Sequence, residues 1–299
     1  MSEIMSITSD VLPIVREKNR ELAQTQAIAR QQTATTLDQF ALTTICDEAK
    51  CPNRHECYAQ HTATFLLLGN ICTRHCGFCG VHSDVSPPPL DPTEPTRVAA
   101  AVQAMGLRHV VLTSVTRDDL PDGGADHFAQ TVEAIHRLPS SPTVEVLPSD
   151  LQGDEVAITR LVAAQPEVYA YNTETVPRLY AKIRDRHANY RTTLHVFRTV
   201  HALTPATPLK TSFLLGLGET TEELLDTWSE LRDCGVSRLT LGQYLRPSRK
   251  NLPVNRYLQE DEFVELAKLA QKLGFQVMAG SRVRSSYHAR EMLINRHDT

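Results

Sequence analysis

Short runs of apolar residues recur along the middle of the chain at the length of buried β-strands. We expect six strands, at residues 64–69, 109–114, 144–148, 168–172, 210–216 and 238–245. Their first residues lie 45, 35, 24, 42 and 28 positions apart, and a gap of that size holds a crossover helix. The spacing therefore predicts parallel strands in an α/β architecture.

Helical patterns fill most of the gaps between these runs. They cover residues 94–105, 126–138, 154–164, 191–203, 221–234 and 260–273. Before the fifth of them, Thr220 or Thr221 supplies an N-cap, and Glu223 lies in the first turn, which predicts a helix start at this point.

Polar residues stand where the expected strands end. They are Thr113 and Ser114, Asn172 and Glu174, Gly216-Leu217-Gly218-Glu219, and Gln243-Tyr244. In parallel α/β barrels the carboxyl ends of the strands converge on one ligand site, so these side chains are expected to share a pocket. The glycine pair is either a tight strand-to-helix turn or a place where the backbone approaches a cofactor; it lacks the third glycine of a dinucleotide-binding fingerprint.

Composition and charge are those of a globular enzyme. The chain has 299 residues, is 41% hydrophobic and carries a net charge of −4, so it can form one barrel-sized domain or two smaller ones. Without a basic excess, nucleic acid is not an expected partner. The N-terminal residues contain no apolar stretch of the length of a signal peptide or membrane span, and we therefore expect a cytoplasmic protein that needs no membrane.

Six of the seven cysteines lie within 34 residues of sequence, in two triplets. The first is Cys46-x4-Cys51-x5-Cys57, and the second, Cys72-x3-Cys76-x2-Cys79, follows the first expected strand. In a reduced compartment, clustered cysteines more often hold metal than form disulfides. Three thiolates suit iron–sulfur clusters, zinc or Cu(I), and each triplet leaves one coordination position for a ligand that is not cysteine.

Two simpler explanations compete with iron. Cys76-Gly77-Phe78-Cys79 alone is a thioredoxin-type CxxC, but that motif needs no companion cysteine upstream. Structural zinc is the stronger rival, because four histidines lie near the triplets: His55, His61, His75 and His82. Cys234 stands alone in a helical stretch and is expected to pack as a small buried hydrophobe.

The second triplet resembles a known motif. Residues 72–79, CTRHCGFC, are similar to the CxxxCxxC motif of radical SAM enzymes, including the aromatic residue before the last cysteine. The first triplet, the stretch TSVTRDDL at residues 113–120 and RSSYH at residues 284–288 narrow the resemblance to the lipoyl synthase family, over residues 42–289. Several positions depart from the family pattern, including Tyr171 before Asn172, which leaves a divergent paralogue with another substrate preference open.

The resemblance implies two [4Fe-4S] clusters with different roles. Cys72, Cys76 and Cys79 would hold the cluster whose fourth iron binds S-adenosylmethionine, the source of a 5′-deoxyadenosyl radical. Cys46, Cys51 and Cys57 would hold an auxiliary cluster, completed by a serine of the RSSY motif, which is Ser286 by position. The family's auxiliary cluster supplies the sulfur inserted at C6 and C8 of an octanoyl chain on a carrier-protein lysine. From the residues alone, Ser286 would instead belong to a hydroxyl-rich turn or cap.

Further site residues follow less directly from the resemblance. Candidates to contact S-adenosylmethionine are Phe78, Thr113, Ser114, Asn172, Glu174, Glu219 and Gln243. All but Phe78 could equally be ordinary strand-end caps. Lys210, Arg246 and Arg249 would face the acyl-lysine or an acidic carrier, or form a solvated rim.

Pattern and resemblance together predict the domain organisation and partners. The expected fold class is α/β, with a partial (β/α)6 TIM-type barrel at residues 61–280. An N-terminal extension (1–41) and an auxiliary-cluster segment (42–60) precede the barrel, and a C-terminal tail (281–299) that carries Ser286 follows it. The implied partners are an octanoylated lipoyl-carrier domain or an H-protein-like carrier, a reductant such as flavodoxin or ferredoxin, and an iron–sulfur carrier that rebuilds the auxiliary cluster. Alternatives are another sulfur inserter, of the biotin synthase or methylthiotransferase kind, and a zinc-binding scaffold or carrier-binding module without radical chemistry.

Overall fold

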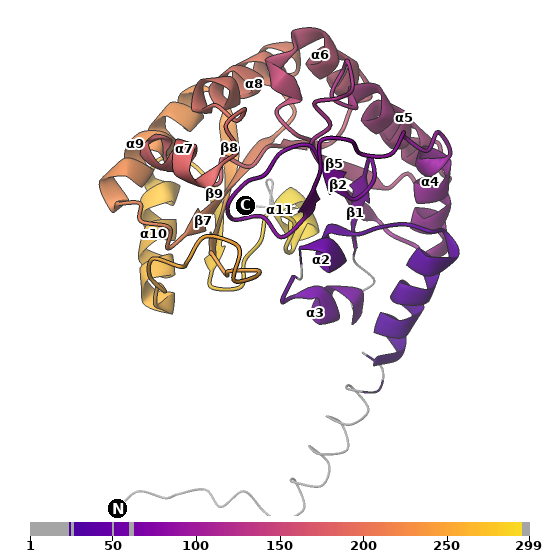
Figure 1. Ribbon diagram of the computed structural model, residues 1–299, viewed down its shortest axis with the longest axis horizontal. Coiled ribbons are helices and arrows are strands. Elements are labelled where there is room, and N and C mark those ends of the chain that lie inside the picture. Colours follow the sequence, from indigo (N-terminus) through magenta and orange to yellow (C-terminus); the bar gives the residue numbers. More distant parts are fainter. Residues whose placement is uncertain (1–23, 25–26, 50, 60–62, 295–299) are drawn as a thin grey trace, which may run out of the picture.

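Seven parallel strands form the central sheet, and each strand pairs with the strand that follows it in the sheet (Figure 1). The computed structural model describes residues 24, 27–49, 51–59 and 63–294. The strands are β1 (Thr64–Leu67), β4 (His109–Ser114), β5 (Thr143–Leu147), β6 (Val168–Ala170), β7 (Leu209–Leu215), β8 (Val236–Gln243) and β9 (Gln276–Gly280). Because every pair of neighbouring strands is parallel, all carboxyl ends lie at one edge, as in a TIM-type barrel.

Six long helices cover the outer face of this sheet. They are α4 (Glu94–Ala104), α5 (Ala125–His136), α6 (Glu155–Ala163), α8 (Tyr190–Leu203), α9 (Thr221–Asp233) and α10 (Glu260–Lys272), and they form an arc around the strands in Figure 1. Helix faces bury large side chains against the sheet, including Phe128, Phe197 and Trp228, each 0% exposed. The expected fold class, a partial barrel of parallel strands and crossover helices, is confirmed.

The last strand, β9, is one more than the six expected from the sequence. It pairs with β8 from Arg238↔Gln276 to Gly242↔Gly280. All five of its residues are only half buried, because β9 lies at an edge of the sheet. Edge strands lack the continuous apolar run of strands covered on both faces, and the sequence signal was correspondingly weak.

The start of α9 shows how local sequence sets an element boundary. The Thr220 hydroxyl accepts a hydrogen bond from the Glu223 amide at 3.3 Å, and the Glu223 carboxylate accepts one from the Thr220 amide at 2.9 Å. This reciprocal capping box satisfies two amides that the helix leaves unpaired. The N-cap is therefore Thr220.

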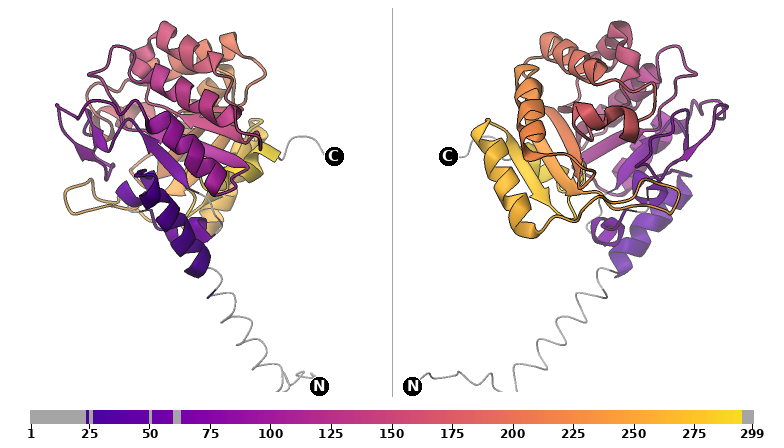
Figure 2. Two further views of the ribbon diagram at one scale, coloured as in Figure 1. Left: turned by 90° about the vertical axis from the view of Figure 1, so that its right-hand side faces the viewer. Right: turned by 60° about the vertical axis from the view of Figure 1, so that its left-hand side comes forward.

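Helical residues 27–39 pack beside the barrel (Figure 2). Thr33 is buried, and its hydroxyl donates to the backbone carbonyl of Tyr58 at 2.9 Å. Arg97 of α4 donates to the carbonyl of Ala41 at 2.7 Å. Residues 1–23 of the expected N-terminal extension lie outside the described residues.

A buried ion pair crosses the barrel interior near the amino-terminal ends of the strands. Lys210 of β7 donates to both carboxylate oxygens of Glu145 of β5, at 2.8 and 3.1 Å, and both side chains are 1% exposed. The hypothesis that Lys210 faces the acyl-lysine or the carrier is therefore wrong. The pair involves the second residue of β7, whereas the second cysteine triplet lies in a loop beyond the carboxyl end of β1.

Replacing Lys210 by methionine is expected to lower the free energy of unfolding by about 3–5 kcal/mol, because Glu145 would remain buried without its partner. The double variant Lys210→Met/Glu145→Leu should recover most of this loss. Guanidinium unfolding monitored by circular dichroism measures both values. A single variant as stable as the unmodified chain would contradict the expectation.

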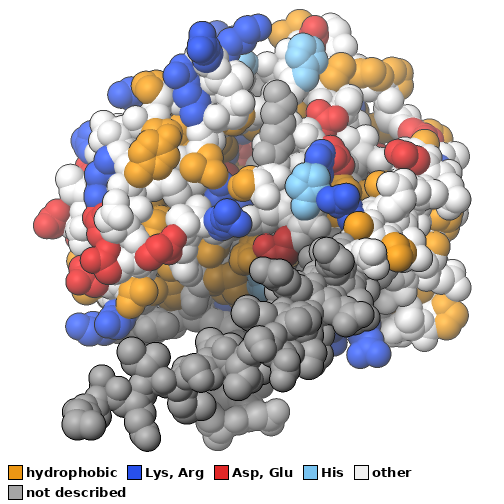
Figure 3. Space-filling model, turned by 90° about the horizontal axis from the view of Figure 1, so that it is seen from below, with side chains coloured by type: hydrophobic (Ala, Val, Ile, Leu, Met, Phe, Trp, Pro, Cys, Tyr) orange, Lys and Arg blue, Asp and Glu red, His pale blue; other side chains and the backbone are white. Residues whose placement is uncertain are grey.

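The surface carries a mixture of side-chain types. In the view from below in Figure 3, basic, acidic and apolar side chains are interspersed over the described part of that face. Among the helices of the described part of the chain, none combines the length and apolarity needed to cross a bilayer.

Candidate active site

The second cysteine triplet lies in a loop between the first and second strands of the central sheet. The loop leaves β1, forms a two-stranded sheet of β2 (Ile71–Cys72) and β3 (His82–Ser83), and then leads to α4. Backbone amides point at its sulfur atoms: those of Arg74 and Thr116 lie 3.4 Å from Cys72 Sγ, and that of Asp185 lies 3.3 Å from Cys76 Sγ. Amide donors favour the thiolate form and tune the potential of a bound cluster.

Neighbouring loops hold this cysteine loop from two sides. The Gly77 amide donates to the carbonyl of Ile183, at the end of α7 (Tyr180–Ile183), and Gly77 accepts from the Leu252 amide, both at 2.9 Å. The Asn251 side chain donates to the Cys79 carbonyl at 2.7 Å. A Cβ at Gly77 would lie 2.8 Å from Leu252, so the close approach of this loop favours glycine here.

Burial makes these thiols weak acids in the protein alone. The pKa of Cys79 is raised to about 12, mainly by burial and in part by the neighbouring Cys76 and Cys72. The pKa of Cys76 is also raised by burial, while the nearby Arg184 guanidinium opposes the shift. Thiolates gathered in one place need a compensating cation, and metal binding would release their protons.

The first triplet lies in a separate segment beside β1. Cys46 belongs to α2 (Ile45–Glu48), Cys57 to α3 (Arg54–Ala59), and Cys51 to the turn between them. This segment is braced internally: Asp47 accepts hydrogen bonds from Thr44, Arg54 and Tyr58, and the Cys51 amide donates to the Cys46 carbonyl at 3.0 Å. Burial raises the pKa of Cys46 to about 11 and that of Cys57 to about 12, and the thiols of the triplet reinforce each other.

The structure brings Ser286 to Thr64, 222 residues earlier in the sequence, which in turn contacts the first triplet. The Thr64 hydroxyl donates to Ser286 Oγ at 2.9 Å, and Thr64 also hydrogen-bonds the Cys46 sulfur. Two further contacts fasten the C-terminal segment to the cysteine segment: Asn53 donates to the Arg282 carbonyl at 2.7 Å, and the Tyr287 hydroxyl to Glu56 at 3.0 Å. Thr64 therefore links the Ser286 hydroxyl to Cys46, a connection that the sequence alone left open.

Three of the candidate contacts to S-adenosylmethionine have their polar groups engaged within the protein. Thr113 donates to the Leu147 carbonyl at 2.9 Å, and Glu219 accepts from the amides of Gly216 and Leu217 at 2.6 and 2.9 Å. The Gln243 amide nitrogen lies 3.1 Å from three carbonyl oxygens, and its oxygen accepts from the Leu258 amide. These contacts favour a supporting role, in which Glu219 and Gln243 shape the loops at the ends of β7 and β8.

Asn172 and Glu174 remain better placed to meet a ligand. Glu174 is buried with φ of 69°, a left-handed conformation that non-glycine residues adopt mainly where the surroundings impose it. Burial raises its pKa, and the Arg184 guanidinium partly offsets this effect. Asn172 Oδ1 is buried without a hydrogen-bond partner, as expected for a group that binds a polar ligand. Ser114 at the end of β4 and Phe78 in the cysteine loop are half buried.

Sequence reasoning missed Arg184. Its guanidinium donates to the Asn172 carbonyl at 2.8 Å and to the Tyr171 hydroxyl at 2.9 Å, and it lies over the rings of Tyr171 and Tyr180. In the sequence it belongs to Arg184-Asp185-Arg186-His187, which is indistinguishable from a solvated charged loop. Only the fold turns one of these charges inward.

The two triplets are not compact sites for one metal ion. Within the described residues, no three Cys, His, Asp or Glu side chains converge closely enough to hold a single ion. Of the histidines that favoured zinc, His75 bonds the Ser83 hydroxyl at 2.8 Å, and His61 lies outside the described residues. In an iron–sulfur cluster the thiolates bind different irons, so such a ligand set suits the wider spacing.

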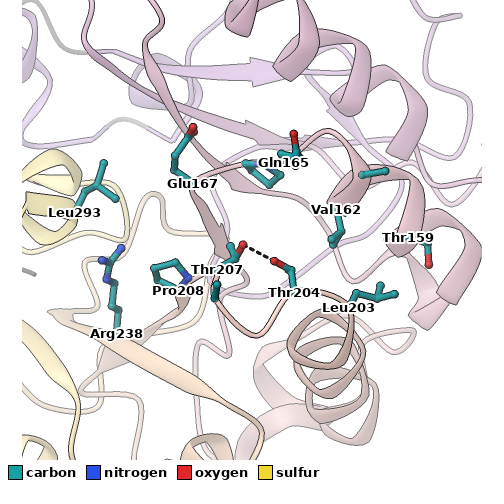
Figure 4. Close-up of a pocket in the computed structure, with 13 residues that line it drawn as sticks. Thr159, Val162, Gln165, Glu167, Leu203, Thr204, Thr207, Pro208, Arg238 and Leu293 are labelled. Carbon is teal, nitrogen blue, oxygen red and sulfur yellow. Dashed lines mark hydrogen bonds between the residues drawn. The ribbon is translucent and has the colours of Figure 1, made fainter.

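Two cavities of similar size lie at different ends of the strands. One, of about 600 Å³, borders the cysteine loop and is lined by Thr73, Arg74, Val85, Asp118, Asp119, Asp150, Gln152, His187 and Thr192. The other, of about 630 Å³, lies where β6, β7 and β8 begin, and its lining includes Glu167, Pro208, Arg238 and Leu293 (Figure 4). The lining of this second cavity includes no cysteine, so it is separate from both triplets.

A partial parallel barrel with three cysteines in the loop after its first strand defines the class of the protein. The Radical SAM superfamily model matches residues 66–231, which places the chain in that superfamily. Solved structures agree on the fold: the FeFe-hydrogenase maturase HydG from Carboxydothermus hydrogenoformans is similar with a TM-score of 0.58 over 95% of this chain and 71% of that one, at 16% identity. The structure of methylornithine synthase is similar with a TM-score of 0.56 over 71% of this chain and 62% of that one, at 14% identity.

Curated relatives narrow the class to one family. A lipoyl synthase from Rhodopirellula baltica is 50% identical over 261 residues, which cover 87% of this chain and 82% of the relative. A lipoyl synthase from Caldanaerobacter subterraneus is 50% identical over 85% of this chain and 88% of the relative. Lipoyl synthase 2 from Thermosynechococcus vestitus is 48% identical over 92% of this chain and 94% of the relative. The chain belongs to the lipoyl synthase family.

Proposed function

We propose that this chain has lipoyl synthase activity: it inserts two sulfur atoms, at C6 and C8, into an octanoyl chain carried on a protein lysine, giving lipoyl-lysine. The observation that carries the proposal is the presence of two separate cysteine triplets, the first of which is linked to Ser286 through Thr64. A radical SAM enzyme needs only the second triplet. A second set of ligands completed by an oxygen donor supports sulfur insertion.

The radical-forming site would be built by the second triplet and the barrel lumen. Cys72, Cys76 and Cys79 would hold a [4Fe-4S] cluster, which, when bound, supplies the electron that cleaves S-adenosylmethionine. Asn172 and Glu174 lie where the strands end and would accept hydrogen bonds from the amino and hydroxyl groups of that cofactor. Arg184 fixes the Asn172 backbone, and Phe78 would pack beside the cluster.

The sulfur-supplying site would be built by Cys46, Cys51, Cys57 and Ser286. A second [4Fe-4S] cluster held there supplies the sulfur atoms when bound. An oxygen donor matches iron–sulfur chemistry less well than a thiolate, so Ser286 is suited to leave an iron when the cluster gives up sulfide. Thr64 and Tyr287 would keep the serine segment in place before and after that departure.

The partners follow from this chemistry. The substrate would be an octanoylated lipoyl-carrier domain or an H-protein-like carrier, the electron donor a flavodoxin or ferredoxin, and an iron–sulfur carrier would rebuild the consumed cluster, all in the cytoplasm. Residues 42–60 would serve as the auxiliary-cluster segment, 61–280 as the barrel and 281–299 as the tail that supplies Ser286.

Anaerobic reconstitution with iron and sulfide tests the proposal. We expect about eight irons per chain and conversion of an octanoylated carrier to its lipoyl form, detected by mass spectrometry, when S-adenosylmethionine and a reductant are added. Bound zinc without acid-labile sulfide would contradict it. So would S-adenosylmethionine cleavage with no sulfur in the carrier.

Changing Gly242 of β8 to alanine is expected to displace the C-terminal segment. A Cβ there would lie 2.1 Å from the Val283 carbonyl oxygen, and backbone cannot yield as a side chain does. Overpacking of this kind costs about 1–3 kcal/mol of stability, and it should reduce lipoyl formation more than S-adenosylmethionine cleavage, because Ser286 lies on the displaced segment. Thermal unfolding and the two product assays measure these effects.

Ser237→Ala, at the other end of β8, is the matched control and should behave as the unmodified chain. Equal loss of both products in Gly242→Ala would mean that the strand, and not the serine segment, was damaged.

A further inference from the structure

An arginine between two of the cysteines is buried against two carboxylates. Arg74 follows Cys72 by two residues and precedes Cys76 by two, and its side chain is 4% exposed. Its guanidinium contacts both oxygens of Asp118, at 2.7 and 2.8 Å, and both oxygens of Asp150, at 2.7 and 2.9 Å. Paired N–H donors of this fork geometry fix orientation as well as distance.

The two carboxylates come from neighbouring strand ends. Asp118 lies in the loop after β4 and Asp150 in the loop after β5, so Arg74 ties the cysteine loop to both. Thr73 adds to the connection, since its amide and hydroxyl both donate to the Thr116 carbonyl and its hydroxyl accepts from the Asp118 amide. The cysteine loop is thus attached to the barrel rim by side-chain and backbone contacts of the protein itself.

The backbone beyond Asp150 is strained where this connection ends. Leu151, Gln152 and Gly153 follow one another with φ of 46°, 55° and 73°. Non-glycine residues keep left-handed conformations only where their surroundings hold them, and Asp150 is 1% exposed within the Arg74 fork. The ion cluster therefore fixes this turn as well as the cysteine loop.

Stability alone is a weak reason for such an arrangement. A buried cluster of one guanidinium and two carboxylates pays a large desolvation penalty, and well-packed apolar side chains would often stabilise a loop as well or better. Apolar contacts do not fix the orientation of one segment against another, whereas paired hydrogen bonds do. The geometry of the Arg74 guanidinium therefore suits a group that sets the orientation of the cysteine loop toward the barrel lumen.

We propose that Arg74 is a positioning residue, whose fork onto Asp118 and Asp150 sets the cysteine loop at the strand ends before any cluster is present. In consequence, the second triplet would face Asn172 and Glu174 in a fixed orientation. This orientation rests on the proposed function. The attachment of the cysteine loop by Arg74, Asp118 and Asp150, which we call the clamp, does not. A lysine keeps the charge but has no planar fork to bridge two carboxylates.

Two measurements on the full chain test the clamp. In the metal-free protein, hydrogen exchange should show faster exchange across residues 72–79, about tenfold or more, in Arg74→Gln and in Arg74→Lys. In the reconstituted protein, electron paramagnetic resonance of the reduced cluster should change on addition of S-adenosylmethionine in the unmodified chain but not in these variants. Misplacement of reacting groups by about 1 Å costs up to about a hundredfold in rate, and cofactor cleavage should fall accordingly.

Arg160 provides the matched control, because it also bridges two carboxylates, Asp126 and Glu133, at 2.7 and 2.8 Å, but on the exposed faces of α5 and α6. Arg160→Gln should leave the exchange of residues 72–79 and the spectrum unchanged. Should Arg74→Gln fail to fold, Arg74→Gln/Asp118→Asn/Asp150→Asn leaves no unpaired buried charge, and it should fold while showing the same fast exchange.

The proposal would be overturned if residues 72–79 of the Arg74 variants exchanged as slowly as those of the unmodified chain. It would also be overturned if Arg74→Lys had both the exchange rate and the spectrum of the unmodified chain. If the unmodified chain gave no cluster spectrum at all, the proposed function would fail, and the metal-free exchange comparison would still decide whether Arg74 holds the loop.

Discussion

Replacing Cys76 by alanine is expected to abolish cleavage of S-adenosylmethionine and to lower the iron content from about eight to about four per chain. The Cys76 sulfur lies 3.3 Å from the Asp185 amide, and nearby Cys72 and Glu174 raise the pKa of this buried thiol along with burial itself. A cluster left with two thiolates would be lost or would present the wrong iron to the cofactor. Methionine and 5′-deoxyadenosine, measured by liquid chromatography, report cleavage directly.

Two other cysteines provide the comparison for this experiment. Cys51→Ala should also remove about four irons but retain cleavage of S-adenosylmethionine, with no lipoyl product, because it disturbs only the first triplet. Cys234→Ala should keep all the iron, since Cys234 is 1% exposed at the end of α9, outside both triplets. If Cys76→Ala cleaved S-adenosylmethionine at the unmodified rate, the Cys76 thiol would not be a cluster ligand.

Ser286→Ala is expected to suppress lipoyl formation while leaving cleavage of S-adenosylmethionine within about threefold of the unmodified rate. The serine hydroxyl lies 2.9 Å from the hydroxyl of Thr64, the first residue of β1, whereas the second triplet lies in the loop that follows the last residue of β1. Even outer partners of metal ligands contribute about 10- to 100-fold to affinity or activity, so loss of a ligand should lower product formation at least as much. The ratio of lipoyl product to 5′-deoxyadenosine measures this uncoupling.

Ser286→Cys and Ser285→Ala complete the design. A thiolate at position 286 would bind iron more tightly than a hydroxyl, so the auxiliary cluster should form fully while sulfur transfer slows. Ser285→Ala changes the neighbouring hydroxyl and should have little effect. Unimpaired lipoyl formation in Ser286→Ala would show that the hydroxyl is not a ligand, and the contact with Thr64 would then be a turn contact only.

The six expected helices and the six expected strands were predicted about equally closely, each within about two residues of its observed ends. The helices were recognised because amphipathic periodicity and caps such as Thr220 are local signals. The strands β1 and β4 were recognised from short runs of apolar residues, which are typical of parallel strands covered on both sides. The edge strand β9 was missed, since half-buried residues carry no such run.

Within the site, the residues that were found carry chemistry in their own side-chain type. Cysteine triplets are rare and specific, so their spacing alone indicated two metal centres. Arg74 and Arg184 were missed, because an arginine in a loop is usually solvated and nothing local marks the buried exceptions. Conversely, Gln243 and Glu219 were expected to meet the cofactor, but their side chains hold loop backbone, a use that only the neighbouring chain segments reveal.

The sequence by itself determined the class of fold, the two triplets and the family resemblance, because these depend on periodicity and on the spacing of reactive side chains along the chain. The tertiary structure decided which distant groups meet: Ser286 with Cys46 through Thr64, Arg74 with Asp118 and Asp150, and Lys210 with Glu145. Such contacts depend on burial and on the packing of segments remote in sequence. A residue's own type does not specify whether its charge will face water or a partner.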